Sequence, residues 1–190
     1  AFALITTSGN LYANDHVATV AEYAHIIDFD SNRVLLSKNA DLPMKPASMA
    51  KIMTLYIVFS QIADGTLTLE DEFLVSEKAW KMGGSRSFLD VGTLVSIEAL
   101  IKGVAVQSGN DAAVVIAEGI SGSEDAFADK MNRFAKRLGM TNTNFTNSTG
   151  WPDPDLSTTA KDLAILTTAL IRDFPINTYP DLYPVFKKPE

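Results

Sequence analysis

Ser48 and Lys51 are the pair of side chains in this sequence whose types and spacing best suit covalent chemistry. Lys51 is the only charge in an apolar stretch from Pro46 to Ala63, which is typical of the buried central helix of a domain. Burial disfavours an ammonium ion, so it lowers the pKa of a lysine toward the range in which the amine accepts a proton. Residues three apart share one helix face, which brings the Ser48 hydroxyl within reach of the amine. The pair therefore predicts a serine nucleophile and its general base.

The Ser-x-x-Lys pattern is short, and it also has a structural interpretation. A serine before a helix is a common N-cap, and a lysine can extend its amine to solvent along an apolar surface. Pro46 agrees with a helix start here, since proline is favoured in the first turn. The apolar setting of Lys51 favours the chemical interpretation, because an extended amine needs a nearby route to water.

A second polar group, Ser108-Gly109-Asn110, lies between two expected helices. A serine and an asparagine on a short turn can direct two polar side chains into a cleft. The same residues are ordinary turn and N-cap composition, so alone they favour a structural role. In this order and at this separation, the two elements match the first two of three motifs of penicillin-binding proteins and active-site-serine β-lactamases.

More of the chain resembles one branch of these proteins, the low-molecular-weight D-alanyl-D-alanine carboxypeptidases of peptidase family S11. The resemblance covers residues 22–186 and rests on segments 45–54 (KPASMAKIMT), 83–86 (GGSR), 107–113 (QSGNDAA), 144–154 (NFTNSTGWPDP) and 157–162 (STTAKD). It implies that Ser48 is the acyl nucleophile, Lys51 the general base and Ser108 a proton relay. It also implies that Asn110 binds substrate.

The GGSR segment contains two further candidates for substrate binding, Gly84 and Ser85. In the family this loop lies beside the cleft, and its glycines would allow it to move. An ordinary Gly-Gly turn is the alternative.

The resemblance implies an enzyme that removes the terminal D-alanine from peptidoglycan stem peptides through an acyl-enzyme, without a cofactor. It further implies covalent inhibition by β-lactams and a periplasmic location, with membrane anchoring through a C-terminal segment that this chain does not contain. Two alternatives stay open. One is a serine β-lactamase, although Glu118 and Glu124 fall on expected helices and not in a suitable loop. The other is a non-catalytic fragment that binds the cell wall.

The third family motif, Lys-Thr/Ser-Gly, has no counterpart here. No lysine is followed by Thr-Gly or Ser-Gly, and Ser148-Thr149-Gly150 lacks the cation. In relatives the motif comes some tens of residues after the Phe-Pro that is here Phe174-Pro175. We therefore expect the domain to be incomplete at its C-terminus. The unpaired strand edge that this leaves predicts poor solubility.

The elements that must position these side chains follow an α+β pattern. Residues 24–29 and 33–37 predict an antiparallel hairpin around a polar turn, and the apolar helix from Pro46 follows. A short strand is expected near 73–75, and then helices at 97–106, 112–120, 124–138 and 159–172. The resemblance implies a DD-peptidase/β-lactamase-like fold, an antiparallel sheet backed by helices plus a helical lobe. The last strands of that sheet are expected to lie beyond this chain.

The composition of the chain excludes several classes of function. The chain has 190 residues, 46% of them hydrophobic and 21% charged, which fits one globular domain. The resemblance implies that residues 22–190 form a serine D,D-peptidase domain. A net charge of -7 argues against nucleic acid as a partner. With two histidines and no cysteine, a metal site is not expected. Residues 1–21 are interpreted as the remnant of an export signal, or alternatively as a segment that packs on the domain.

Overall fold

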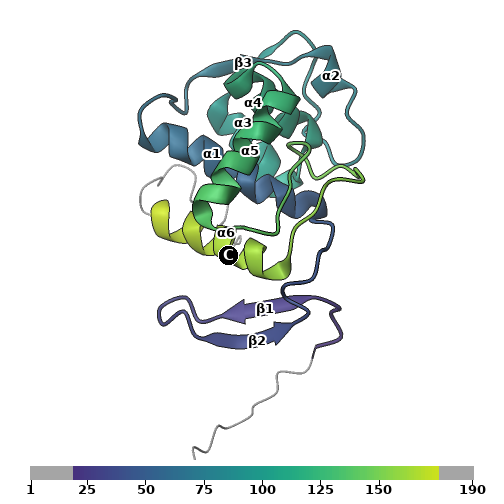
Figure 1. Cartoon of the computed structure of the whole chain (residues 1–190). Helices are drawn as coiled ribbons and strands as arrows, with labels where there is room; N and C mark the ends of the chain where they lie inside the picture. The colour runs from purple at the N-terminus through teal and green to yellow at the C-terminus, as the bar shows by residue number, and fades with distance from the viewer. Residues whose placement is uncertain (1–18, 176–190) are drawn as a thin grey trace, which may run out of the picture.

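The computed structural model describes residues 19–175, so the segment interpreted as an export signal lies almost wholly outside the described residues. The helix α1 runs through the middle of the helical region, and the β1–β2 hairpin lies beyond α6 (Figure 1). The described elements, in chain order, are β1 (Ala24–Ile27), β2 (Val34–Lys38), the 3-10 turn η1 (Ala47–Ala50), α1 (Lys51–Ala63), β3 (Glu72–Leu74), α2 (Glu77–Trp80), β4 (Leu94–Ser96), α3 (Ile97–Gln107), α4 (Asn110–Ser121), α5 (Glu124–Leu138) and α6 (Ala160–Asp173).

The β1–β2 hairpin confirms the predicted pair of antiparallel strands. Ala24 pairs with Lys38, and the register shifts after Ile26. The first strand ends earlier than predicted, because the Asp28 carboxylate accepts a hydrogen bond of 2.9 Å from the Ser31 N–H. A local bond of this kind favours a turn over continued strand pairing.

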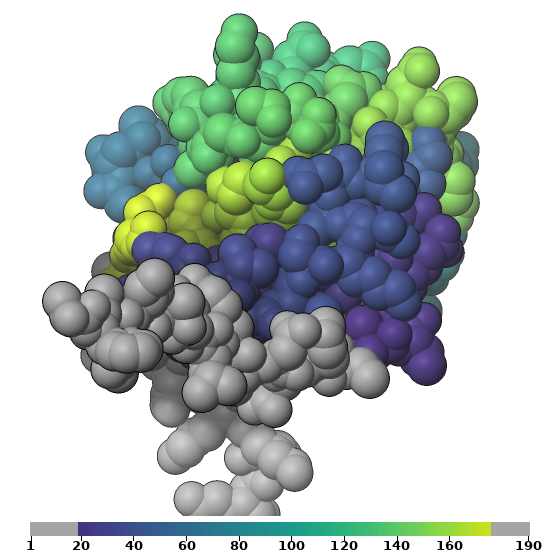
Figure 2. Space-filling model, turned by 60° about the horizontal axis from the view of Figure 1, so that its bottom comes forward, coloured from purple at the N-terminus to yellow at the C-terminus, as the bar shows by residue number. Residues whose placement is uncertain are grey.

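The hairpin packs through β1 against α6. In Figure 2 the purple and dark blue hairpin lies beside the yellow-green helix. Several large apolar side chains of the hairpin stay exposed to solvent: Ile26, Phe29, Val34 and Leu35. The expectation of poor solubility rests on this surface.

The central helix α1 is confirmed, but its start differs from the prediction. It contacts α3, α4, α5 and α6, and its Met53, Ile57 and Val58 are fully buried. Its first turn is the separate 3-10 turn η1, and Ala47 has a φ of +47°. Residues other than glycine rarely adopt this left-handed value. The chain therefore bends sharply just before Ser48.

The lobe after α1 is built around α3 and α4. Eight consecutive residues of α4 are buried, from Asn110 to Ala117. The predicted strand near 73–75 corresponds to β3, which pairs antiparallel with β4. Neither β4 nor the single turn α2 was predicted, because three or four residues are too few to show a periodic pattern.

The last two helices are defined by their caps. The Ser123 hydroxyl accepts from the Ala126 N–H at 3.2 Å, and the Thr159 hydroxyl accepts from the Asp162 N–H at 3.0 Å. Gly139 ends α5 with a φ of +86°. The predicted span of α5 is confirmed at both ends, and α6 is displaced by one residue from its predicted span. These helix ends can be predicted because the capping residues are recognisable in the sequence.

Candidate active site

The first two predicted site residues lie at the start of the central helix. Ser48 is exposed in η1, whereas Lys51, the first residue of α1, is only 4% exposed. The Lys51 Nζ lies 3.2 Å from the Ser48 Oγ, within hydrogen-bond distance. A substrate can therefore reach the hydroxyl while the amine beneath it stays out of water.

Two carbonyl oxygens surround the Lys51 amine on its other sides. The Nζ atom donates to Asn110 Oδ1 at 2.7 Å and to the main-chain oxygen of Thr149 at 3.1 Å. Both oxygens can only accept hydrogen bonds. A neutral amine has two N–H groups and one lone pair, so two carbonyls that take both N–H groups leave the lone pair for Ser48. This geometry suits an amine that removes the serine proton.

Burial also changes the acidity of this amine. It lowers the pKa of Lys51 from 10.5 to about 8, because the ammonium form loses its hydration. A substantial fraction of the molecules then carries the neutral amine at mildly alkaline pH. The electrostatics and the hydrogen-bond geometry therefore favour the same role for Lys51.

Asn110 is oriented from two sides at the first turn of α4. Its Nδ2 donates to the Gly83 carbonyl at 2.7 Å, and its backbone N–H donates to the Ser85 carbonyl at 2.8 Å. The loop that contains Gly84 and Ser85 thus lies beside the site and is exposed. Gly84 has a φ of +73°, and an added Cβ there would lie 2.9 Å from Asn110 Nδ2. These contacts fix the amide so that its oxygen faces Lys51.

Ser108 is the predicted site residue that the structure does not join to the others. It is the C-cap of α3, with a left-handed backbone at φ +55° and ψ +36°. Its half-buried hydroxyl makes no hydrogen bond to any residue between 19 and 175. Its role as a proton relay stays a prediction.

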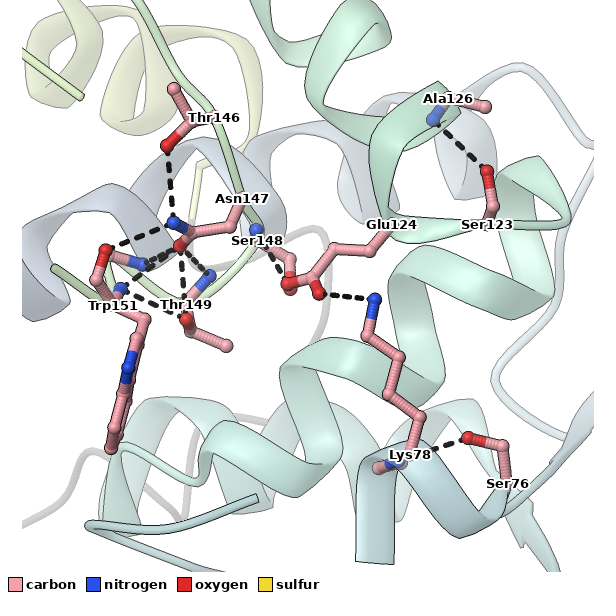
Figure 3. Close-up of polar contacts among 12 residues, drawn as sticks. Ser76, Lys78, Ser123, Glu124, Ala126, Thr146, Asn147, Ser148, Thr149 and Trp151 are labelled. Atoms are coloured by element: carbon pink, nitrogen blue, oxygen red, sulfur yellow. Dashed lines mark hydrogen bonds and ion pairs between the residues drawn. The ribbon is translucent and has the colours of Figure 1, made fainter. Parts of the chain in front are cut away.

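The Thr149 carbonyl is a part of the site that sequence reasoning missed. It belongs to a turn around Asn147, whose Oδ1 accepts from the N–H groups of Thr149, Gly150 and Trp151 at 2.8–3.2 Å (Figure 3). The polar composition of this segment indicated a turn. Every residue has the same main-chain carbonyl, so the sequence could not indicate which carbonyl faces Lys51.

A second set of contacts joins this turn to the chain just before Ser48. The Lys45 Nζ donates three hydrogen bonds of 2.7–3.0 Å to the main-chain carbonyls of Asp153, Pro154 and Leu156. Gly150 has a φ of +81° and lies so close to Ala47 that an added Cβ would be 1.7 Å from the Ala47 oxygen. The segment before Ser48 and the turn that contains the Thr149 carbonyl are therefore packed directly against each other.

Elsewhere on the described part of the chain we find no second cluster of comparable chemistry. Within residues 19–175 no three potential metal-ligating side chains gather at one point. A hollow of about 640 Å³ between β1, the start of α1 and α6 contains none of the predicted site residues, and its lining is mostly apolar. No helix in the described part of the chain combines the length and apolar character needed to cross a bilayer.

The Ser48–Lys51 cluster has the arrangement that a serine hydrolase with a lysine as its base requires. The family model for D-alanyl-D-alanine carboxypeptidase, peptidase family S11, matches residues 11–183. The chain is 37% identical over 186 residues to carboxypeptidase DacF of Bacillus subtilis, an alignment that covers 95% of this chain and 48% of that protein. It is 41% identical over 156 residues to carboxypeptidase DacC of Escherichia coli, with 79% and 39% covered.

Solved structures give the same result. Carboxypeptidase DacD of Francisella tularensis superposes with a TM-score of 0.83 at 36% identity, over 98% of this chain and 42% of that one. Penicillin binding protein 5 of Haemophilus influenzae gives 0.80 at 37% identity, over 87% and 47%. The chain belongs to the D-alanyl-D-alanine carboxypeptidase family, and the predicted fold class is confirmed. It spans less than half the length of these two curated relatives.

Proposed function

We propose that this chain carries the acylation site of a serine-type D-Ala-D-Ala carboxypeptidase. The observation that carries the proposal is the Lys51 amine, which has carbonyls of Asn110 and Thr149 on two sides and the Ser48 hydroxyl on the third. Family membership supports the reaction class, since the curated relatives are named as D-alanyl-D-alanine carboxypeptidases.

The proposed reaction has two steps. The Ser48 Oγ attacks the carbonyl carbon between the last two D-alanines of a peptidoglycan stem peptide, and its proton passes to the Lys51 Nζ. The C–N bond then breaks, the leaving amine takes up a proton through Ser108, and D-alanine departs from an ester on Ser48. Water hydrolyses this ester and restores the hydroxyl, so the sum is hydrolysis of one peptide bond.

Groups around the nucleophile are proposed to bind the substrate. Asn110 and the exposed loop with Gly84 and Ser85 would hydrogen-bond the peptide backbone. The Ser48 N–H, at the N-terminus of the central helix, would be one donor to the developing oxyanion.

β-Lactams are proposed to acylate the same serine. Two structural neighbours support this. One is the Haemophilus influenzae penicillin binding protein, and the other is penicillin-binding protein D2 of Listeria monocytogenes, solved in an ampicillin-bound form (26% identity, TM-score 0.73). A serine β-lactamase is not favoured, because the Glu124 carboxylate is bound by Lys78 and Ser148.

We place the protein outside the cytoplasm, and specifically in the periplasm, because its proposed substrate is the cell wall. Attachment to the inner membrane is part of the same proposal. Cell fractionation followed by penicillin labelling tests the location. A labelled band in the periplasmic or membrane fraction supports it, and one confined to the cytoplasm contradicts it.

The function is tested by measuring the intact mass after incubation with benzylpenicillin, for this chain and for the full product of its gene. We expect one adduct per molecule, which Ser48→Ala abolishes, and release of D-alanine from a peptide ending in D-Ala-D-Ala. If only the full product reacts, segments outside this chain are needed for acylation. A folded full product that forms no adduct and releases no D-alanine would instead support the non-catalytic, wall-binding alternative.

The pH dependence of acylation is a separate prediction. The rate constant should rise with pH and level off above about 8, because burial has lowered the pKa of Lys51 to that value and the neutral amine is the base. Stopped-flow acylation on both sides of this pH, corrected for spontaneous hydrolysis of the antibiotic, measures the profile. A rate constant that falls over this range would exclude Lys51 as the base.

A further inference from the structure

A buried carboxylate with no part in the proposed reaction lies behind the Thr149 carbonyl. Glu124, the first residue of α5, is 8% exposed, and its Oε2 forms an ion pair of 2.8 Å with the Lys78 Nζ of α2. Burying a carboxylate is unfavourable unless it is paired and hydrogen-bonded. Burial opposes ionisation of Glu124, but hydrogen bonds from Lys78 and Ser148 outweigh it and lower the pKa of the carboxyl. The group is therefore an anion.

The other carboxylate oxygen holds the turn that faces Lys51. Glu124 Oε1 accepts from the Ser148 hydroxyl at 2.7 Å and from the Ser148 N–H at 3.1 Å (Figure 3). A carboxylate that binds both donors of one residue fixes the position and the rotation of that peptide unit.

Two further hydrogen bonds connect this turn to α1 and to the Lys51 amine. The Ser148 carbonyl accepts from the Thr54 hydroxyl of α1 at 2.7 Å, and the next carbonyl, that of Thr149, accepts from the Lys51 Nζ. Asn147 holds the same turn from the opposite side (Figure 3). The path from Glu124 to Lys51 therefore consists of a hydrogen bond at each end and the main chain of Ser148 and Thr149 between them.

We propose that Glu124, held by Lys78, is a positioning residue that fixes the Thr149 carbonyl so that the Lys51 lone pair faces Ser48. This inference rests on the proposed function, because it assigns Glu124 to the same acylation step. Without the Thr149 acceptor, the amine has one carbonyl partner and can rotate its lone pair away from the serine. Groups that support a reacting atom in this way typically change activity about 10- to 100-fold when they are removed.

The test compares Glu124→Ala and Glu124→Gln with Asp125→Asn, an exposed carboxylate in the same first turn of α5. The charged groups around Glu124 are Lys78 and, acting on that lysine, Glu118 and Asp125. Asp125→Asn therefore controls for charge at this helix end without touching Ser148. Glutamine keeps an oxygen that can accept from Ser148, so Glu124→Gln should recover part of the activity that Glu124→Ala loses.

Two readouts are needed for each folded variant. Benzylpenicillin saturation kinetics separate noncovalent binding from the acylation rate constant, and only the rate constant should fall. Titration of the Lys51 side chain by ¹³C NMR, assigned with Lys51→Met, reports the amine directly. Its midpoint should move to lower pH in Glu124→Ala, because the ammonium has lost a carbonyl acceptor.

The outcomes separate this inference from the proposed function. If neither the wild-type chain nor the full product of its gene is acylated, the proposed function fails, and the Lys51 titration alone decides the positioning role. An unshifted titration and an unchanged rate constant in folded Glu124→Gln or Glu124→Ala would overturn the inference. So would equal effects in Asp125→Asn. If Glu124→Ala does not fold, Glu124→Gln supplies the same comparison, with a smaller expected shift.

Discussion

Replacing Lys51 by methionine is expected to slow acylation of Ser48 by about 10²- to 10⁴-fold, the usual contribution of a positioned general base. Methionine fills similar space but has no basic nitrogen. The variant should stay folded, because burial of the Lys51 ammonium opposes folding by about 3 kcal/mol at neutral pH, judged from its lowered pKa. The carbonyls of Asn110 and Thr149 lose a donor, which offsets part of that gain. Intact-mass time courses and thermal melting measure the two effects.

Two comparisons make the Lys51 result specific. Lys51→Arg keeps the positive charge but cannot give up its proton, so it should be as slow as methionine. Because the folded-state pKa of Lys51 lies below its ordinary value, wild-type stability should rise between about pH 8 and 10.5. The methionine variant should lack this rise. Rapid acylation of Lys51→Arg would show that the lysine acts only as a charge.

Replacing Gly150 by alanine is expected to destabilise the chain by about 3–5 kcal/mol, the sum of backbone strain and overpacking. Gly150 has a φ of +81°, and the new Cβ would lie 1.7 Å from the Ala47 oxygen. The clash involves main chain on both sides, so it cannot be relieved by rotating a side chain. The turn must separate from the segment before Ser48, and acylation should be lost as well.

Gly122→Ala is the matched control, since Gly122 has a φ of +78° and nothing within 4 Å of an added Cβ. It should cost only the strain of the left-handed backbone, about 1–2 kcal/mol. At about 2–4 °C per kcal/mol for a chain of this size, thermal melting resolves the difference. Equal melting temperatures for the two variants would show that the Gly150–Ala47 contact is not tight.

The parts of the fold that could be predicted are those with local signals. The helix α5 has a capping serine at 123, an apolar stripe and a terminal glycine at 139, and its range was predicted at both ends. The hairpin β1–β2 was predicted from its polar turn. By contrast, β4 is defined by its pairing with β3, and α2 is a single turn that packs on α4, so neither shows a periodic pattern in the sequence. The left-handed backbone of Ala47 is not indicated by its residue type.

The candidate site also contains residues that could be predicted from the sequence and groups that could not. Ser48, Lys51 and Asn110 could be predicted because their side-chain types and spacing are recognisable, and the structure brings them together. The Thr149 carbonyl and the Glu124 carboxylate could not, because they act through main-chain atoms and through contacts between distant segments. The sequence placed Glu124 on a helix correctly, but nothing in it indicated that the carboxylate faces Ser148.

The hydrogen bonds from Lys45 to the carbonyls of Asp153, Pro154 and Leu156 affect the stage of folding at which the site can form. These bonds join residues 108–111 positions apart, and the bond from Lys51 to the Thr149 carbonyl spans 98. Contacts between segments this distant require closure of long loops, which is entropically unfavourable until the rest of the domain has formed. Ser48 and Lys51 are adjacent once η1 and the first turn of α1 have formed, yet Lys51 gains the Thr149 carbonyl as a partner only after residues near 150 have been synthesised and docked.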